Sequence, residues 1–165
     1  MKYLNNPYIL KKINLTSYEM TKTTEHDVAS YILDKTGEIS AMKLQKLIYY
    51  SQAWAMVWDE CALFDADFEA WANGPVLPSI YEIHRGQFLV DKSMFPKGNP
   101  KNLDEDARDT IDQVLKVYGK KTAQWLSNLT HEEAPWKNAR GDLGPLNRSN
   151  TVIEKGSMHE YYSGL

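Results

Sequence analysis

The chain has 165 residues, enough for one domain with a hydrophobic core. Nineteen Lys and Arg against 22 Asp and Glu give a net charge of −3, which argues against a protein that binds nucleic acid over most of its surface. The single cysteine excludes an internal disulfide, and the longest apolar run, residues 53–58, is far too short for a membrane span. The first 20 residues offer only the apolar run 8–10, too short for the core of a secretory signal. We therefore expect a cytoplasmic protein without membrane contact.

Residues 1–22 are predicted to form a basic N-terminal arm, separate from one domain at residues 23–165. Four lysines and one glutamate give the arm a charge of 4 − 1 = +3, which leaves −6 for the remainder. A weakly periodic basic segment is typical of a frayed terminus. The alternative is a docking arm that becomes ordered on a partner.

Two helices are predicted next, over residues 25–35 and from Ser40 to Trp58. Thr24 is a suitable N-cap for the first, and Gly37 ends it. In the second, apolar residues recur at steps of three and four, which predicts a stripe that faces the core. The polar residues expected mostly outside this stripe are Lys43, Gln45 and Lys46.

A short strand is predicted over residues 67–72, where apolar and polar residues alternate. Asn73, Gly74 and Pro75 break it, and Gly74 is expected to hold a left-handed conformation. Pro78 suits the first turn of a third helix, which ends near residue 86. Residues 87–103 are predicted to form a loop. Within it, residues 87–90 are a candidate strand that would pair with residues 67–72.

Three helices are predicted in the last third of the chain. Asp104 opens one and Thr122 begins the next, while a short last helix covers about residues 154–162. Thr130 and Glu133 have the spacing of a capping box, in which each side chain bonds a backbone amide.

The sequence predicts no catalytic, metal or cofactor site. His131 and two glutamates precede Pro135, where a metalloprotease helix would need its second histidine. A hydrolase that uses His131 and Glu133 is thus only a remote alternative. His84, Arg85 and Gly86 form a modest anion site at best. Lysines 22, 35, 43 and 46 with Tyr49 and Tyr50 are a candidate RNA patch, although such tyrosines are more typical of a core.

Three blocks of the sequence carry a family resemblance: residues 43–54 (KLQKLIYYSQAW), 68–76 (FEAWANGPV) followed by Pro78 and Tyr81, and 129–136 (LTHEEAPW). Together, over about residues 24–163, they resemble the Panacea domain, also called the SocA-like or GepA-like antitoxin domain. The family-motif residues, expected to be scaffold or toxin-facing, are Lys43, Gln45, Lys46, Tyr49, Trp54, Trp71, Gly74, Pro75, Tyr81, Thr130, His131, Glu133, Pro135 and Trp136.

The resemblance implies a mainly α domain of five to seven helices with a small two- or three-stranded antiparallel β element. Three of its tryptophans, Trp54, Trp71 and Trp136, are candidates for one shared aromatic core. It implies a non-enzymatic antitoxin of a bacterial or prophage toxin–antitoxin module, which binds its cognate protein toxin directly. The alternatives are a protease adaptor that delivers the toxin for degradation and a phage-encoded regulator. Many members carry an N-terminal DNA-binding module, but 22 residues are too few for one, so DNA binding is not expected.

Overall fold

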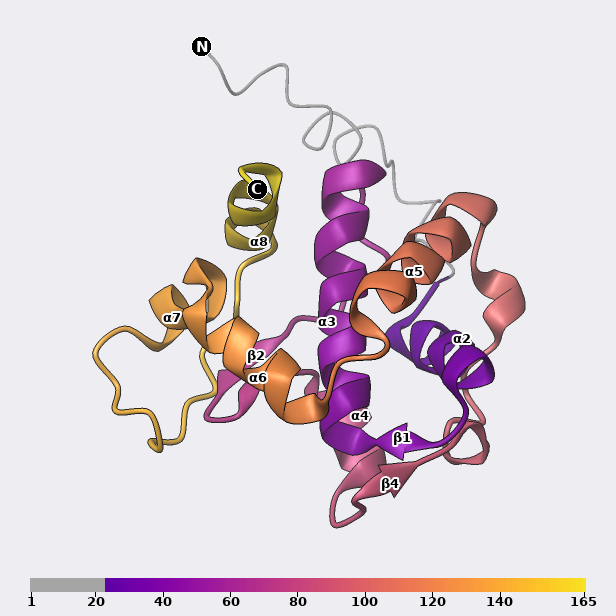
Figure 1. The fold of residues 1–165 in the computed structure, drawn as a ribbon, viewed down its shortest axis with the longest axis horizontal. Helices are drawn as coiled ribbons and strands as arrows, with labels where there is room; N and C mark the ends of the chain where they lie inside the picture. The colour runs from indigo at the N-terminus through magenta and orange to yellow at the C-terminus, as the bar shows by residue number, and fades with distance from the viewer. Residues whose placement is uncertain (1–22) are drawn as a thin grey trace.

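The structure is a computed structural model that describes residues 23–165, so the arm expected at residues 1–22 lies outside the described residues. Within the described part there are seven α-helices and two small antiparallel sheets, which confirms the mainly α class. Figure 1 shows the helices arranged around the long helix α3. Among residues 23–165, no helix is both long and apolar enough to cross a membrane.

The elements follow the chain in this order: α2 (Glu25–Thr36), β1 (Ile39–Ser40), α3 (Ala41–Trp58), β2 (Glu69–Trp71), β3 (Gly74–Val76), α4 (Pro78–His84), β4 (Leu89–Val90), the 3₁₀ turns η1 (Lys92–Met94) and η2 (Pro100–Asn102), α5 (Glu105–Tyr118), α6 (Ala123–Glu132), α7 (Ala134–Arg140) and α8 (Lys155–Ser163).

Helix ends lie where the capping residues place them. The hydroxyl of Thr24 accepts from the amide of Asp27, and the carboxylate of Asp27 accepts from the amide of Thr24, which closes a capping box on α2. Ser40 caps α3 by accepting from the amide of Lys43, 3.2 Å away. The predictions of caps at Thr24 and Ser40 are therefore confirmed.

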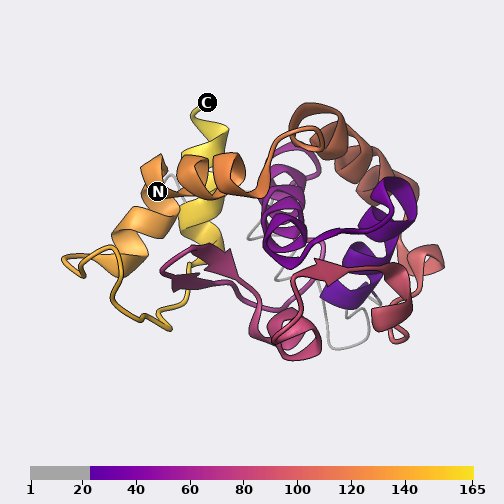
Figure 2. The ribbon, with the colours of Figure 1, turned by 60° about the horizontal axis from the view of Figure 1, so that its bottom comes forward.

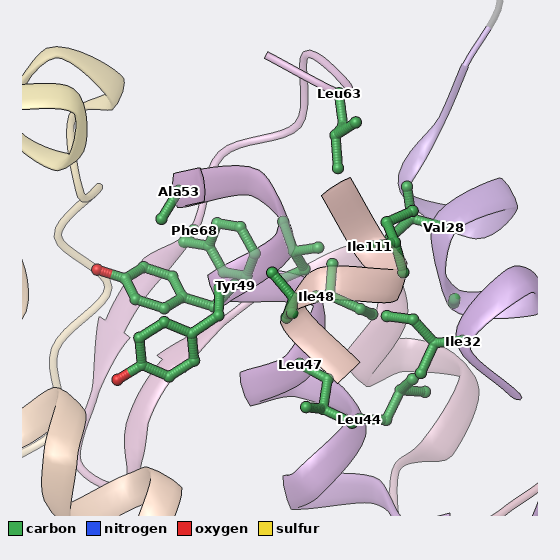
Figure 3. Close-up of a cluster of buried hydrophobic side chains, with 14 of the residues drawn as sticks. Val28, Ile32, Leu44, Leu47, Ile48, Tyr49, Ala53, Leu63, Phe68 and Ile111 are labelled. Carbon is green, nitrogen blue, oxygen red and sulfur yellow. The ribbon is translucent and has the colours of Figure 1, made fainter. Parts of the chain in front are cut away.

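The hydrophobic core forms between α3 and the helices α2 and α5. Leu44, Leu47 and Ile48 of α3 are fully buried, and so are Ile32 of α2 and Ile111 of α5. Figure 3 shows these side chains pointing into one cluster from the three helices. The periodic stripe on α3 thus packs as the sequence predicts.

The prediction that residues 87–90 pair with residues 67–72 is wrong. The strand β2 pairs instead with β3, in register Trp71 to Gly74, so that a two-residue loop joins them. The strand β4 pairs with β1, at the start of α3. The backbone of residues 151–153 extends the β2–β3 hairpin, because the amide of Ala70 donates to the carbonyl of Thr151.

The prediction of a capping box at Thr130 and Glu133 is also wrong. Thr130 lies inside α6, whose N-cap is Thr122, and its hydroxyl donates to the carbonyl of Ser127 at 2.7 Å. A threonine inside a helix commonly bonds back to the preceding turn in this way. Glu133 is the residue between α6 and α7, and its carboxylate faces Tyr50 and Tyr162.

Candidate partner-binding pocket

A cavity of about 830 Å³ opens beside the first turns of α3. Among its lining residues, we call the buried Gln45 and Lys46 of α3 the floor, the half-buried Trp71 and Tyr81 the walls, and the exposed Phe88 the edge. Figure 2, which brings this side forward, shows the β2–β3 hairpin and α4 next to each other. Residues 148–150 complete the lining from the chain that returns along the hairpin.

Gln45 holds the chain between β3 and α4 in place. Its Oε1 accepts from the amide of Leu77 at 2.9 Å, and its Nε2 donates to the carbonyl of Leu77 at 3.3 Å. The same Nε2 lies 3.0 Å from Nε2 of His84. Because an amide nitrogen only donates, Nε2 of His84 accepts and the ring is neutral with its proton on Nδ1. Burial lowers the pKa of His84, which favours this neutral form.

Lys46 is buried at the pocket floor, with 1% of its surface exposed. Its Nζ donates to the carbonyl of Pro75 at 3.1 Å. Burial alone lowers the pKa of Lys46 to about 7, because the charged ammonium is desolvated. The expectation that Gln45 and Lys46 lie off the buried face is therefore wrong.

Gly74 makes room for the Lys46 side chain. Its φ is +111°, as the sequence predicts for a residue in the turn. A Cβ at this position would lie 2.5 Å from Cε of Lys46 and 2.8 Å from Oγ1 of Thr130. Only glycine satisfies both the backbone angle and the contact. Gly74, Lys46 and Thr130 are thus one packing unit, drawn from all three blocks of the resemblance.

A layer behind the pocket is held by Trp136 and Arg140. The His131 ring stacks on Trp136 with centroids 4.1 Å apart, and Nε1 of Trp136 donates to the carbonyl of Trp71 at 2.8 Å. The pKa of His131 is lowered, first by burial and then by Lys46 and Arg140. The guanidinium of Arg140, over the Trp136 ring, donates to three carbonyls: Ala70, Gly144 and Asn147. Arg140 therefore ties the chain that leads to residues 148–150 to the hairpin.

Glu133 belongs to a tyrosine cluster that lies one helical turn beyond Lys46 along α3. Its carboxylate accepts from the hydroxyl of Tyr50 at 3.0 Å and from that of Tyr162, which also lies 3.2 Å from the Tyr49 hydroxyl. Burial raises the pKa of Glu133, against the effect of the two tyrosine donors. Its two hydrogen bonds join α3 to α8 and are typical of a structural carboxylate.

Four of the family-motif residues, Gln45, Lys46, Trp71 and Tyr81, line the pocket. Gly74, Pro75, Thr130, His131 and Trp136 contact these residues or one another. Tyr49 belongs to the cluster around Glu133, and Pro135 is buried at the start of α7. Lys43 lies elsewhere, with its Nζ donating to the carbonyl of Gly119 at the end of α5.

Trp54 contacts other aromatic rings than Trp71 and Trp136 do. It stacks on Trp58 with centroids 5.0 Å apart and donates to the hydroxyl of Tyr118. Trp136 belongs to the main hydrophobic core and Trp54 packs against it, so the shared-core prediction is wrong only for Trp71, whose carbonyl accepts from Trp136.

Two pocket residues were not expected from the sequence. Phe88 is 81% exposed and Arg148 is exposed, so neither follows a burial pattern. Arg85 also lines the pocket, and the sequence indicated it only weakly, as part of the candidate anion site at residues 84–86. A solitary aromatic residue after a predicted helix was the one available clue to Phe88.

The fold and pocket define a helical domain whose cavity has polar side chains at its floor. Comparison with known proteins identifies the family. Residues 44–137 match the model described as "Antitoxin SocA-like, Panacea domain", more than half of the chain, so the chain belongs to this family. It is 29% identical over 125 residues to Antitoxin SocA of Caulobacter vibrioides (strain NA1000 / CB15N), covering 66% of this chain. The match spans 66% of that relative's length, just under two thirds. No solved structure matches.

Proposed function

We propose that the protein is an antitoxin that neutralises a cognate protein toxin by direct binding, without catalysis, and that the pocket is part of the bound surface. The observation that carries the proposal is the family match over residues 44–137, which contains most of the pocket lining. A concave site with aromatic walls and a few fixed polar groups suits recognition of a protruding partner segment.

Phe88 supports the pocket as the binding surface. An aromatic side chain with 81% of its surface exposed gains nothing from its own fold, yet would contribute strongly if a partner covered it. Aromatic residues are enriched where proteins meet. Phe88 therefore has the properties of a contact residue at the edge of the cavity.

Co-expression with the toxin tests the proposal. The neighbouring gene is expressed alone and together with this one, and growth and co-purification are measured. We expect growth arrest by the neighbour alone, rescue by the pair and a stable complex. Phe88→Ala should weaken the complex, whereas Val117→Ala, which removes a 57% exposed side chain of α5 outside the pocket, should not.

A protease adaptor remains the second candidate, and the same experiment distinguishes it. An adaptor would lower the toxin level only in cells that contain the protease, and rescue would fail in protease-deficient cells. Direct neutralisation predicts equal rescue in both strains and an unchanged toxin level. Loss of rescue in the protease-deficient strain, together with the absence of a detectable complex, would contradict direct neutralisation.

The remote hydrolase alternative makes a different prediction at His131. If this ring is scaffold, the His131→Ala protein should still neutralise at a temperature at which it remains folded. A general acid or base contributes about 10²–10⁴-fold to a rate, so an enzyme would lose protection almost completely. A folded His131→Ala protein that binds the toxin normally but fails to protect would contradict a non-catalytic antitoxin.

A further inference from the structure

We propose that the pocket receives an acidic segment of the toxin, in which carboxylates flank an apolar or aromatic side chain. This inference rests on the proposed function and specifies the chemistry of the bound segment. It is carried by the charges and the aromatic walls of the pocket.

The pocket lining has the opposite charge to the rest of the domain. Residues 23–165 have a net charge of −6. The cavity lining nevertheless contains Arg85 and Arg148, and within the described chain none of its lining residues is Asp or Glu. A cleft lined by charges of one sign concentrates the electric field and favours partners of the opposite charge. The local inversion of charge therefore favours an anionic occupant.

The two arginines are available to such an occupant. Arg85 contacts Glu82 at 2.8 Å, but both side chains are more than 60% exposed, and pairs of this kind contribute little to stability. Arg148 is exposed and belongs to a different segment of the lining, next to the chain that Arg140 anchors. A guanidinium binds a carboxylate with two parallel hydrogen bonds, so each arginine can pair with an acidic side chain of the occupant.

The aromatic walls of the pocket favour an occupant that also contains an apolar side chain. Trp71 and Tyr81 pack edge to face with centroids 4.7 Å apart, and Phe88 is exposed at the edge. A small, strongly hydrated anion would leave these rings uncovered. A peptide segment with an apolar side chain between carboxylates would cover the rings and meet both arginines.

The protein's own arm does not suit this site. Residues 1–22 carry a net charge of +3, the same sign as the pocket. A basic arm would meet repulsion from Arg85 and Arg148, so self-occupation is disfavoured. The arm is therefore not the occupant that we propose.

The first experiment reverses the pocket charge. The Arg85→Glu/Arg148→Glu variant is compared with Lys97→Glu/Arg108→Glu, which changes the net charge equally at exposed positions outside the cavity. We expect the pocket variant to raise the Kd for the purified toxin by about 10-fold or more and to weaken the salt dependence of association, because like charges would now meet. Equal effects of the two variants would overturn the inference while leaving neutralisation by binding intact.

A second experiment keeps the inference testable without the toxin. A short acetylated peptide of glutamates around a central phenylalanine is titrated into the full-length protein, with its lysine counterpart as control. We expect chemical-shift changes at Trp71 and Tyr81 with the acidic peptide only, which Arg148→Glu abolishes. Binding of ATP at the pocket without binding of the peptide, or dimerisation that covers the pocket, would overturn the inference.

Discussion

The two faces of α3 are built on different physical principles. One face presents Leu44 and Ile48 to the apolar side chains of α2 and α5, where only shape and hydrophobicity matter. The other presents Gln45 and Lys46 to the hairpin and α4, and Tyr50 to Glu133 and α8, where each buried polar atom needs a partner. The apolar face stabilises the domain, whereas the polar face fixes the geometry of the pocket.

This difference predicts where the protein tolerates substitution. An apolar contact loses strength gradually as its volume changes, and neighbouring side chains adjust in part. A buried polar group that loses its partner costs the full desolvation of that group. We therefore expect the polar face to be the more demanding of the two, and the following substitutions test it.

The largest effect is expected at Trp136. Trp136→Ala removes a buried ring that stacks on His131 and donates to the carbonyl of Trp71, and should lower the free energy of unfolding by about 3–5 kcal/mol. Denaturant unfolding measures this loss. Trp125→Ala is the matched control, since that ring is 43% exposed on α6. Similar losses for the two tryptophans would show that the layer behind the pocket is not a structural unit.

Gly74→Val is expected to have a comparable or somewhat smaller effect. The positive φ costs about 1–2 kcal/mol for a residue with a Cβ, and the contact with Lys46 adds about 1–3 kcal/mol of overpacking. Gly37→Val separates the two causes, because Gly37 also has a positive φ but no atom within 4 Å of its Cβ position. Thermal unfolding that gives equal losses at both sites would rule out the packing role of Gly74.

Lys46→Met should change how stability depends on pH. The pKa of Lys46 falls from 10.5 to about 7 on folding, so between these values the unfolded state binds more protons and stability increases with pH. From about pH 7.5 to pH 9, this coupling should increase the stability of the wild-type protein by about 2 kcal/mol. The increase should be absent from Lys46→Met, which retains all other titrating groups. Parallel stability curves for the two proteins would contradict burial of the lysine in its neutral form.

The smallest effect is expected for Thr130→Val. The substitution preserves side-chain shape and removes one hydrogen bond, from Oγ1 to the carbonyl of Ser127. Unfolding experiments should show a loss of about 0.5–1.5 kcal/mol. A loss well above this range would indicate that the hydroxyl also supports Lys46 and Gly74, and would extend the polar face into α6.

Sequence periodicity predicted the apolar face and could not predict the polar one. The stripe on α3 is local, and so are the caps at Thr24 and Ser40. The partner of Gln45 is 32 residues away and that of Lys46 is 29 residues away, so the polar character of these side chains wrongly indicated exposure. The capping prediction for Glu133 was wrong for the same reason. Its carboxylate accepts from Tyr50, which is 83 residues away in the sequence, and does not cap the helix.

The pocket was predictable only in part. Resemblance identified Gln45, Lys46, Trp71 and Tyr81, which are constrained by packing as well as by position at the cavity. Phe88 and Arg148 are exposed and free of such constraints, so no periodicity or spacing reveals them. A surface adapted to one partner is expected to lie in residues of this kind.

Hydrogen–deuterium exchange of the full-length protein, with and without the bound toxin, tests the central claim most directly. If the pocket binds the toxin, exchange should slow in residues 85–88 and 148–150, while the exposed side of α5 remains unchanged. The two segments are far apart in sequence, so their joint protection would identify the cavity itself. Protection on α5 with unchanged exchange at both pocket segments would contradict the claim.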